Sequence, residues 1–208
     1  MRIANLYIKQ ISDFVASLAG IIILSPIFII IALFIKLTYK GSAFFKQQRL
    51  GKNGKVFNII KFRTMIVNAQ QMGDGLTVKS ENDTRITKVG KILRATSLDE
   101  LPQLFNVLKG DMSLVGPRPP VPYHPYKYEE YNDFQRKRFE MKPGMTGLAQ
   151  VTVRNSVGWD ERIVLDNQYV DNFTVWLDIK ILFKTFIKVF RSRNVYPGAD
   201  EKSGAAEA

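Results

Sequence analysis

The stretch that decides the fold is Phe14–Ile35, which reads FVASLAGIIILSPIFIIIALFI and contains no charged residue. As a helix, these 22 residues would extend about 33 Å, which matches a bilayer hydrocarbon core of about 30 Å. A cleaved signal peptide fits less well, because the run is too long and Lys36–Lys40 follows it in place of a small-residue cleavage site. The stretch therefore predicts a helix that enters a membrane.

The middle and the flanks of this stretch both argue against a straight crossing. Pro26 removes a backbone N–H from the helix and predicts a kink, and the hydroxyl of Ser25 can bond to a backbone group that the kink frees. Basic residues stand on both sides and so predict no orientation; they are Arg2, Lys9, Lys36, Lys40 and Lys46. Two geometries stay open: a spanning helix, and a re-entrant helix that bends at Ser25-Pro26 and leaves by the face it entered.

The rest of the chain predicts an α+β domain that is mostly helical. Two strands, Phe44–Gln48 and Val56–Ile60, flank a turn containing Asn53-Gly54, which is a strong signal for a β-hairpin. The other predicted segments are a short helix at about residues 86–94, a surface loop over 72–83 and a flexible tail over 198–208.

An amphipathic helix is predicted from about Val175 to Arg191. Cations recur along one stripe of this helix, and apolar side chains occupy roughly the opposite face. The apolar face can pack on the core, or it can lie in a membrane interface with the lysines at anionic headgroups. Both interpretations stay open at this stage.

A further helix is predicted to begin near Asp99-Glu100 and to end before Gly110. Ser97 and Glu100 resemble a capping box, but that placement puts Pro102 where its missing N–H would matter. We prefer Asp99 as the N-cap, because Pro102 then falls in the first turn, where the N–H has no partner anyway. This places two adjacent carboxylates at a helix N-terminus.

Asp99-Glu100 has one structural and one chemical interpretation. Acids in a first turn complement the helix dipole and need no further role. Two carboxylates would, however, repel the phosphate that a helix N-terminus attracts, unless a divalent cation lies between them. Mg²⁺ is usually held by one or two carboxylates together with substrate phosphates, and a carboxylate can also act as a nucleophile.

The composition limits the chemistry and indicates an anionic partner. The net charge is +11, which suits nucleic acid, an acidic membrane or a phosphorylated substrate. The chain has no cysteine and a single histidine, His124, so disulfides and multi-histidine metal sites are excluded. Cations that could hold phosphate oxygens are Lys61, Arg63, Arg94, Arg118 between Pro117 and Pro119, and Arg154.

The chain carries four motifs at Lys61–Met65, Thr96–Leu104, Gly116–Pro119 and Lys142–Val151. Together they resemble the bacterial sugar transferase family, the monotopic phosphoglycosyl transferases that begin polyprenol-linked glycan assembly. The resemblance covers about residues 5–195, and the chain looks like the minimal catalytic form. Two departures are Thr152-Val153, where many relatives have Asn-Gly, and Lys142, where an arginine is usual.

The resemblance implies a mechanism and a set of site residues. Asp99, paired with Glu100, would attack the β-phosphate of a UDP-sugar, release UMP and pass the phosphosugar to polyprenol phosphate, with Mg²⁺ as the cofactor. Arg118 in its Pro117-Arg118-Pro119 motif would bind the nucleotide. Further substrate-binding positions implied by the family are Lys61, Arg63, Arg94, Arg154 and, less directly, Asp166.

The resemblance also implies a location and a domain organisation. It favours the re-entrant geometry, with a break at Ser25-Pro26, on the cytoplasmic face of a bacterial inner membrane. The expected division is a re-entrant membrane helix over 1–40, a catalytic domain over 41–197 and the tail over 198–208. A homodimer is one possible assembly.

Two other functions compete with this prediction. A non-catalytic basic adaptor on a membrane surface would explain the charge and the amphipathic helix, but it would give Asp99-Glu100 and Arg118 no role. A nucleic-acid-binding protein would explain the charge, but a central membrane segment disfavours it. We therefore expect no nucleic-acid partner.

Overall fold

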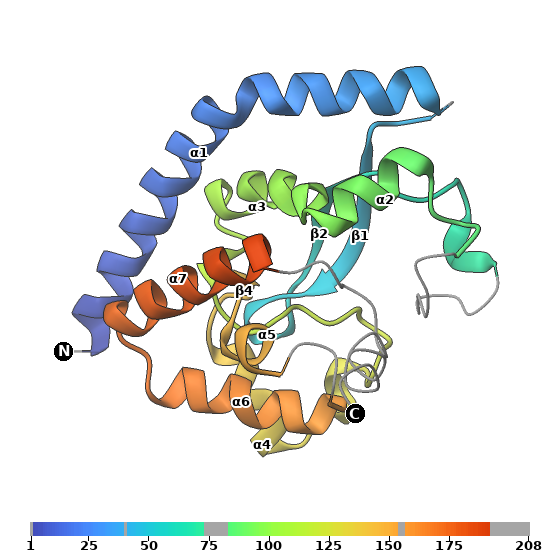
Figure 1. Cartoon of the computed structure of the whole chain (residues 1–208). Coiled ribbons are helices and arrows are strands. Elements are labelled where there is room, and N and C mark those ends of the chain that lie inside the picture. The colour runs from blue at the N-terminus through green and yellow to red at the C-terminus, as the bar shows by residue number, and fades with distance from the viewer. Residues whose placement is uncertain (1, 40, 73–82, 154–156, 192–208) are drawn as a thin grey trace, which may run out of the picture.

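The computed structural model describes residues 2–39, 41–72, 83–153 and 157–191. A long N-terminal helix runs up one side and across the top of an α+β body that is mostly helical, as predicted (Figure 1). The predicted tail lies outside the described residues, as does most of the predicted 72–83 loop. The principal elements are α1 (Arg2–Thr38), β1 (Phe44–Leu50), β2 (Val56–Phe62), α2 (Lys88–Ala95), α3 (Leu104–Leu108), β3 (Ser113–Val115), α4 (Asp133–Arg136), β4 (Gly144–Thr146), α5 (Leu148–Thr152), α6 (Trp159–Asp171) and α7 (Val175–Arg191).

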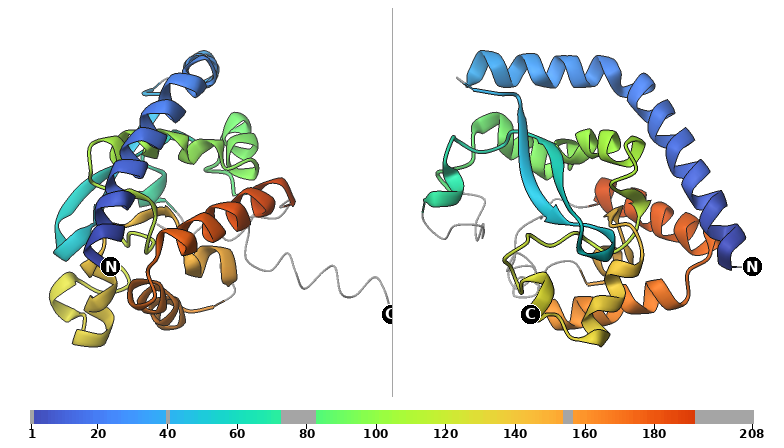
Figure 2. Two further views of the ribbon diagram at one scale, coloured as in Figure 1. Left: turned by 90° about the vertical axis from the view of Figure 1, so that its left-hand side faces the viewer. Right: turned by 180° about the vertical axis from the view of Figure 1, so that it is seen from behind.

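Helix α1 bends partway along its length but is not interrupted (Figures 1 and 2). The hydroxyl of Ser25 donates a 2.8 Å hydrogen bond to the carbonyl of Ile22. That carbonyl stands four residues before Pro26, so it is the group that the proline leaves without an N–H donor. The hydrogen bond expected of Ser25 is present, whereas a break at Ser25-Pro26 and re-entry into a membrane stay predictions.

Both halves of α1 contact the same globular body. In the N-terminal half, Lys9 pairs with Asp178 of α7 at 2.5 Å, and Asp13 accepts a 2.6 Å hydrogen bond from Ser113 of β3. In the C-terminal half, Phe28 and Ile35 are buried in a cluster that includes Phe62 of β2, Leu93 of α2 and Leu104 of α3. The helix is therefore fixed at both ends to one folded unit.

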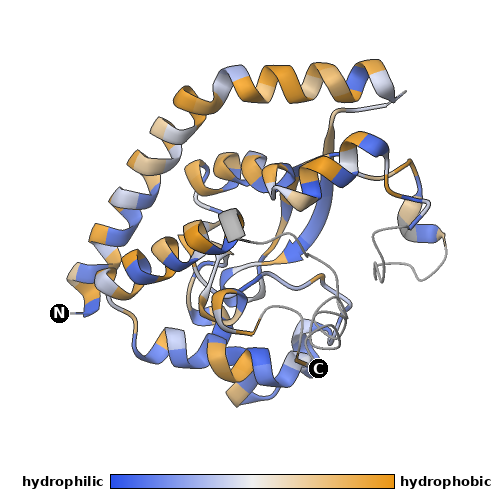
Figure 3. Cartoon of the chain, in the orientation of Figure 1, coloured by the Kyte–Doolittle hydropathy of each residue, from blue (hydrophilic) through white to orange (hydrophobic). Residues whose placement is uncertain are grey.

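The other face of α1 is apolar and exposed. Ile23 is 73% exposed, Ile29 is 69% exposed and Leu37 is 74% exposed. Figure 3 shows hydrophobic residues running along the helix through the bend. By length and composition, α1 is long and apolar enough to cross a membrane. Burial in a protein core does not explain this face.

The predicted hairpin is present and is longer than predicted. Strands β1 and β2 pair antiparallel from Phe44↔Phe62 to Leu50↔Val56. Asn53 and Gly54 both adopt positive φ, which is the conformation that makes Asn-Gly a hairpin turn signal. The side chain of buried Asn106 on α3 accepts from the N–H of Ile60 and donates to the carbonyl of Asn58. These two hydrogen bonds satisfy backbone groups of Ile60 and Asn58 at the edge of β2 and connect the strand to α3.

The prediction that Asp99 caps an α-helix is wrong. Residues Leu98–Gln103 form a 3-10 helix that continues into α3, and Ser97 occupies the N-cap position in a left-handed conformation without a side-chain bond. The alternative capping box is also absent, because Glu100 bonds to Lys61 instead. A tighter turn is compatible with the missing N–H of Pro102 and lets two consecutive carboxylates face different neighbours.

A short parallel strand pair, which the sequence did not indicate, organises the second half of the protein. Ser113 of β3 pairs with Gly144 of β4, and Val115 pairs with Thr146. Gly144 lies so close to the backbone of Gly116 that a side chain there would clash with it. The pairing sets the Pro117-Arg118-Pro119 segment beside the 142–147 loop. Helix α7 has the predicted bounds.

Candidate active site

Glu100 is held by two cations from separate parts of the chain. Its Oε1 lies 2.5 Å from Nζ of Lys61 on β2 and 3.6 Å from a guanidinium nitrogen of Arg118. Burial opposes ionisation of the carboxyl, but the nearby charges of Lys61 and Arg118 outweigh burial and lower its pKa to about 2. Glu100 is therefore a fixed anion that joins the hairpin to the Arg118 segment.

Asp99 has a different environment. Within the described residues its carboxylate forms no ion pair, and burial together with the negative charge of Glu100 raises its pKa to about 6, against the opposing charges of Lys61 and Arg94. Two adjacent carboxyl groups with opposite pKa shifts are typical of a site that assigns them different roles.

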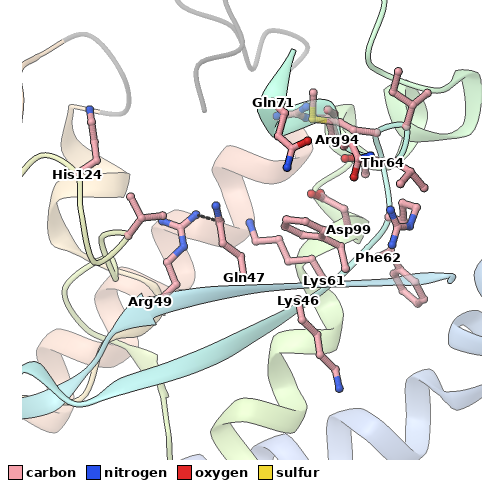
Figure 4. Close-up of a pocket in the computed structure, with 18 of the residues that line it drawn as sticks. Lys46, Gln47, Arg49, Lys61, Phe62, Thr64, Gln71, Arg94, Asp99 and His124 are labelled. Atoms are coloured by element: carbon pink, nitrogen blue, oxygen red, sulfur yellow. Dashed lines mark hydrogen bonds between the residues drawn. The ribbon is translucent and has the colours of Figure 1, made fainter. Parts of the chain in front are cut away.

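Asp99 opens into a hollow of about 610 Å³ between the hairpin, α2 and the 121–124 segment, which we call the Asp99 pocket. Figure 4 shows Asp99, Lys61 and Arg94 on the same side of the hairpin strands. Nη1 of Arg94 is buried and has no hydrogen-bond partner in the described part of the chain, so it is available to a ligand oxygen. The cations and rings that line the pocket are Lys46, Arg49, Lys61, Arg63, Arg94, Phe45, Phe62, His124 and Trp159.

Arg49 belongs to this site although its role was not predicted. It donates to the carbonyl of Pro119 at 3.0 Å and to Gln47 at 2.6 Å, which links β1 to the Arg118 segment. Burial and the charge of Arg118 lower its pKa to about 10. In the sequence it is one of two cations in β1, and only the strand pairing places it beside the carboxylates.

The other predicted site residues divide into three groups. Arg63 lines the Asp99 pocket, but its guanidinium donates to the carbonyl of Ser42 at 2.7 Å. Pro117 and Pro119 supply backbone carbonyls rather than side-chain contacts, and they accept from Gly144 and Arg49 respectively. Arg154 lies outside the described residues.

The carboxylate of Asp166 accepts a hydrogen bond from Arg138, a residue that the sequence did not single out. Arg138 is 1% exposed and donates 2.7 Å bonds to Asp166 and to the backbone carbonyl of Arg118. Burial raises the pKa of Asp166 to about 6 despite the charge of Arg138. In the sequence, Arg136-Lys137-Arg138 resembles an ordinary solvated run of cations, so no pattern distinguishes the buried member.

The carboxylates suit a divalent cation in one specific way. The described residues contain no group of three acidic or histidine side chains that could enclose a metal by themselves. Asp99 and Glu100 nonetheless provide oxygen ligands of the number that Mg²⁺ uses when substrate phosphates complete its shell. The lack of an ion pair at half-buried Asp99 fits this use, because a cation would stabilise the ionised carboxylate.

These features form a carboxylate pair surrounded by cations, an arrangement that suits phosphorylated ligands. Comparison with known protein families agrees with this description of the site. The family described as bacterial sugar transferase matches residues 4–192. The chain belongs to this family.

Similar proteins include enzymes named for transfer to undecaprenyl phosphate. Undecaprenyl-phosphate galactose phosphotransferase of Salmonella typhimurium is 46% identical over 91% of this chain, and UDP-glucose:undecaprenyl-phosphate glucose-1-phosphate transferase of Klebsiella pneumoniae is 41% identical over 92%. The chain spans 42% of the length of each of these relatives. The uncharacterized sugar transferase EpsL of Bacillus subtilis is 41% identical, with 90% of both chains covered.

Proposed function

We propose that this protein transfers a sugar 1-phosphate from a UDP-sugar to polyprenol phosphate and releases UMP. The observation that carries the proposal is the difference in ion pairing between the two carboxylates. Glu100 is neutralised by Lys61 and Arg118, whereas Asp99 faces a basic hollow without an ion pair in the described chain. The names of the similar proteins support the same reaction class.

In the first half-reaction, an Asp99 oxygen attacks the β-phosphorus of the UDP-sugar. A phosphorus–oxygen bond forms to Asp99, the bond to the bridging oxygen breaks, and UMP leaves with the electron pair. In the second half-reaction, an oxygen of polyprenol phosphate attacks the same phosphorus and the Asp99 carboxylate departs. Two phosphoryl transfers through one carboxylate give a ping-pong mechanism.

The cations of the site would stabilise the charge that shifts during both steps. Lys61 and Arg94 lie on the Asp99 side, and Arg118 contacts Glu100 from the other side. Asp99 and Glu100 would hold Mg²⁺, which neutralises phosphate charge when bound. The preformed Lys61–Glu100 pair means that little rearrangement is needed when a substrate arrives.

We also infer that α1 is re-entrant and holds the catalytic body on the cytoplasmic face of a bacterial inner membrane. Lys9 and Asp13 anchor one half of α1 to the body, and Phe28 and Ile35 anchor the other half. A helix fixed at both ends to one folded unit does not deliver its ends to opposite sides of a bilayer. The exposed apolar face around the bend then supplies the membrane contact.

The test is UMP release from UDP-glucose, UDP-galactose and other UDP-sugars, with polyprenol phosphate and Mg²⁺, for the native protein and for Asp99→Asn. We expect release with at least one donor and its loss in the variant. With no acceptor present, intact-mass measurement should find a phosphosugar on the native protein alone. Membrane-bound, folded protein that forms no UMP from any donor would instead support the adaptor function.

A further inference from the structure

A second hollow lies on the Glu100 side of the carboxylate pair. Its volume is about 260 Å³, and it lies between the 3-10 helix, α5, α6 and α7; we call it the Arg138 pocket. Glu100, Arg118 and Arg138 line it, whereas Asp99 lines only the Asp99 pocket. The carboxylate pair therefore stands between two hollows, and the mechanism above uses one of them.

The Arg138 pocket is lined by cations, and some of their donor nitrogens have no acceptor among the described residues. Arg118, Arg138, Arg162 and Lys188 line it together with Glu100 and Asp166, and Lys188 already donates to the carbonyls of Gln150 and Val151. Nε and Nη1 of Arg138 and Nε of Arg162 are buried without a hydrogen-bond partner among the described residues. Such donors are costly to bury, and guanidinium groups match an anion that presents several oxygens. These donors indicate a phosphate group as the occupant.

Part of the remaining lining is apolar and leads onto α7, whereas Ser97, Thr146, Gln150 and Thr185 are polar. Met145, Ala149 and Val189 line the pocket, and Val189 is 39% exposed. Phe186 and Leu182 lie three and seven residues before Val189, which places them on the same face of α7, and both are exposed. Figure 3 shows hydrophobic residues alternating with hydrophilic ones along α7. A phosphate bound in this pocket would therefore lie next to an apolar surface that continues along α7.

We propose that the Arg138 pocket binds the phosphate of the lipid acceptor, with the hydrocarbon chain leaving along the apolar face of α7. This inference rests on the proposed function for the identity of the lipid. A lipid phosphate satisfies the unpartnered guanidinium nitrogens and the apolar row together. A nucleotide would satisfy the nitrogens but would leave the exposed apolar row of Leu182, Phe186 and Val189 uncovered.

The test compares binding of geranylgeranyl phosphate, UMP and inorganic phosphate to the full chain in detergent by calorimetry. Arg162→Met should weaken geranylgeranyl phosphate binding about 10-fold or more and leave UMP binding nearly unchanged. Arg162→Lys should recover part of the affinity. The control is Arg136→Met, because Arg136 is exposed on neighbouring α4 and lines neither pocket.

Three other binding outcomes would overturn the assignment of the pocket to the lipid phosphate. Weaker UMP binding with unchanged lipid binding would make the pocket a nucleotide site, and equal weakening would remove its selectivity for lipid. Unchanged binding of all three ligands would show that no anion occupies it. Because binding needs no turnover, lipid binding that depends on Arg162 without UMP formation from any donor would refute the proposed function and keep the site.

Discussion

Nζ of Lys61 on β2 lies 2.5 Å from Oε1 of Glu100, and this ion pair joins the hairpin to the turn that carries both carboxylates. Lys61 is 17% exposed and Glu100 is 26% exposed as side chains, so solvent screens the pair only in part. The contact keeps Glu100 ionised and positions its carboxylate, whereas Asp99 faces the Asp99 pocket without an ion pair in the described chain. The ion pair with Lys61, a residue distant in the sequence, is thus one cause of the different pKa values of the two carboxyl groups.

Replacement of Lys61 should therefore impair catalysis more than folding. Lys61→Met leaves Glu100 with Arg118 at 3.6 Å as its remaining ion-pair partner in the described chain and removes one cation from the Asp99 pocket. We expect kcat for UMP formation to fall about 100-fold, as for loss of one stabilising charge at a phosphoryl-transfer centre. Lys52→Met, in the exposed hairpin turn, is the matched control. Equal losses in the two variants would contradict the assignment.

The first half-reaction should depend on pH through Asp99. The pKa of Asp99 is raised to about 6, and only the ionised carboxylate is a nucleophile. We expect kcat/KM for UMP release to rise between pH 5 and 6 and to level off above pH 7. Glu100 stays ionised in this range because its pKa is lowered, and a UDP-sugar has no group that titrates there. A flat profile from pH 5 to 7 would exclude Asp99 as the titrating nucleophile.

Asp99→Asn should stabilise the protein while it abolishes turnover. A rise in pKa from 3.8 to about 6 means that ionised Asp99 lowers the free energy of unfolding at pH 7, and the variant should regain about 1 to 3 kcal/mol. The sign follows from linkage: the gain is absent below about pH 4, where both states are protonated, and it grows between pH 4 and 6. Thermal unfolding at pH 4 and pH 7, followed by circular dichroism, measures it. A less stable variant at pH 7 would contradict the burial argument.

The two ends of α1 should be accessible from the same side of the membrane. The chain has no cysteine, so Ala4→Cys and Gln48→Cys each introduce a single reactive thiol, and both positions are exposed. In inverted vesicles and in intact spheroplasts, a membrane-impermeant maleimide should label both positions only from the cytoplasmic face. Labelling of the two positions from opposite faces would establish a spanning helix and refute the re-entrant path.

The predictions from sequence succeeded where the local pattern was sufficient. Asn53-Gly54 adopts the turn that its positive φ values permit, and the alternation of charge and apolar residues located α7 to its observed bounds. Ser25 bonds the carbonyl that Pro26 leaves free, which is a contact within one helical turn. The local pattern left Asp99-Glu100 open between a helix-dipole and a chemical role, and the resemblance to the family assigned the chemical role, which stays a proposal.

Contacts between distant segments decided what the local pattern could not. The 3-10 turn at Leu98–Gln103 replaced the predicted cap because Glu100 is drawn to Lys61, 39 residues away. Buried Arg138 is indistinguishable from its solvated neighbours until α6 brings Asp166 against it.

The sequence by itself determined that this chain carries a long apolar helix, a hairpin and an Asp99-Glu100 pair in a basic protein. Those properties depend on composition and on spacings of a few residues. Only the tertiary structure decided which carboxylate is neutralised, which cations surround it and that a second basic hollow lies behind Glu100. The physical reason is that the pKa of a carboxyl group depends on burial and on charges within a few ångströms, and most of those charges come from segments remote in the chain.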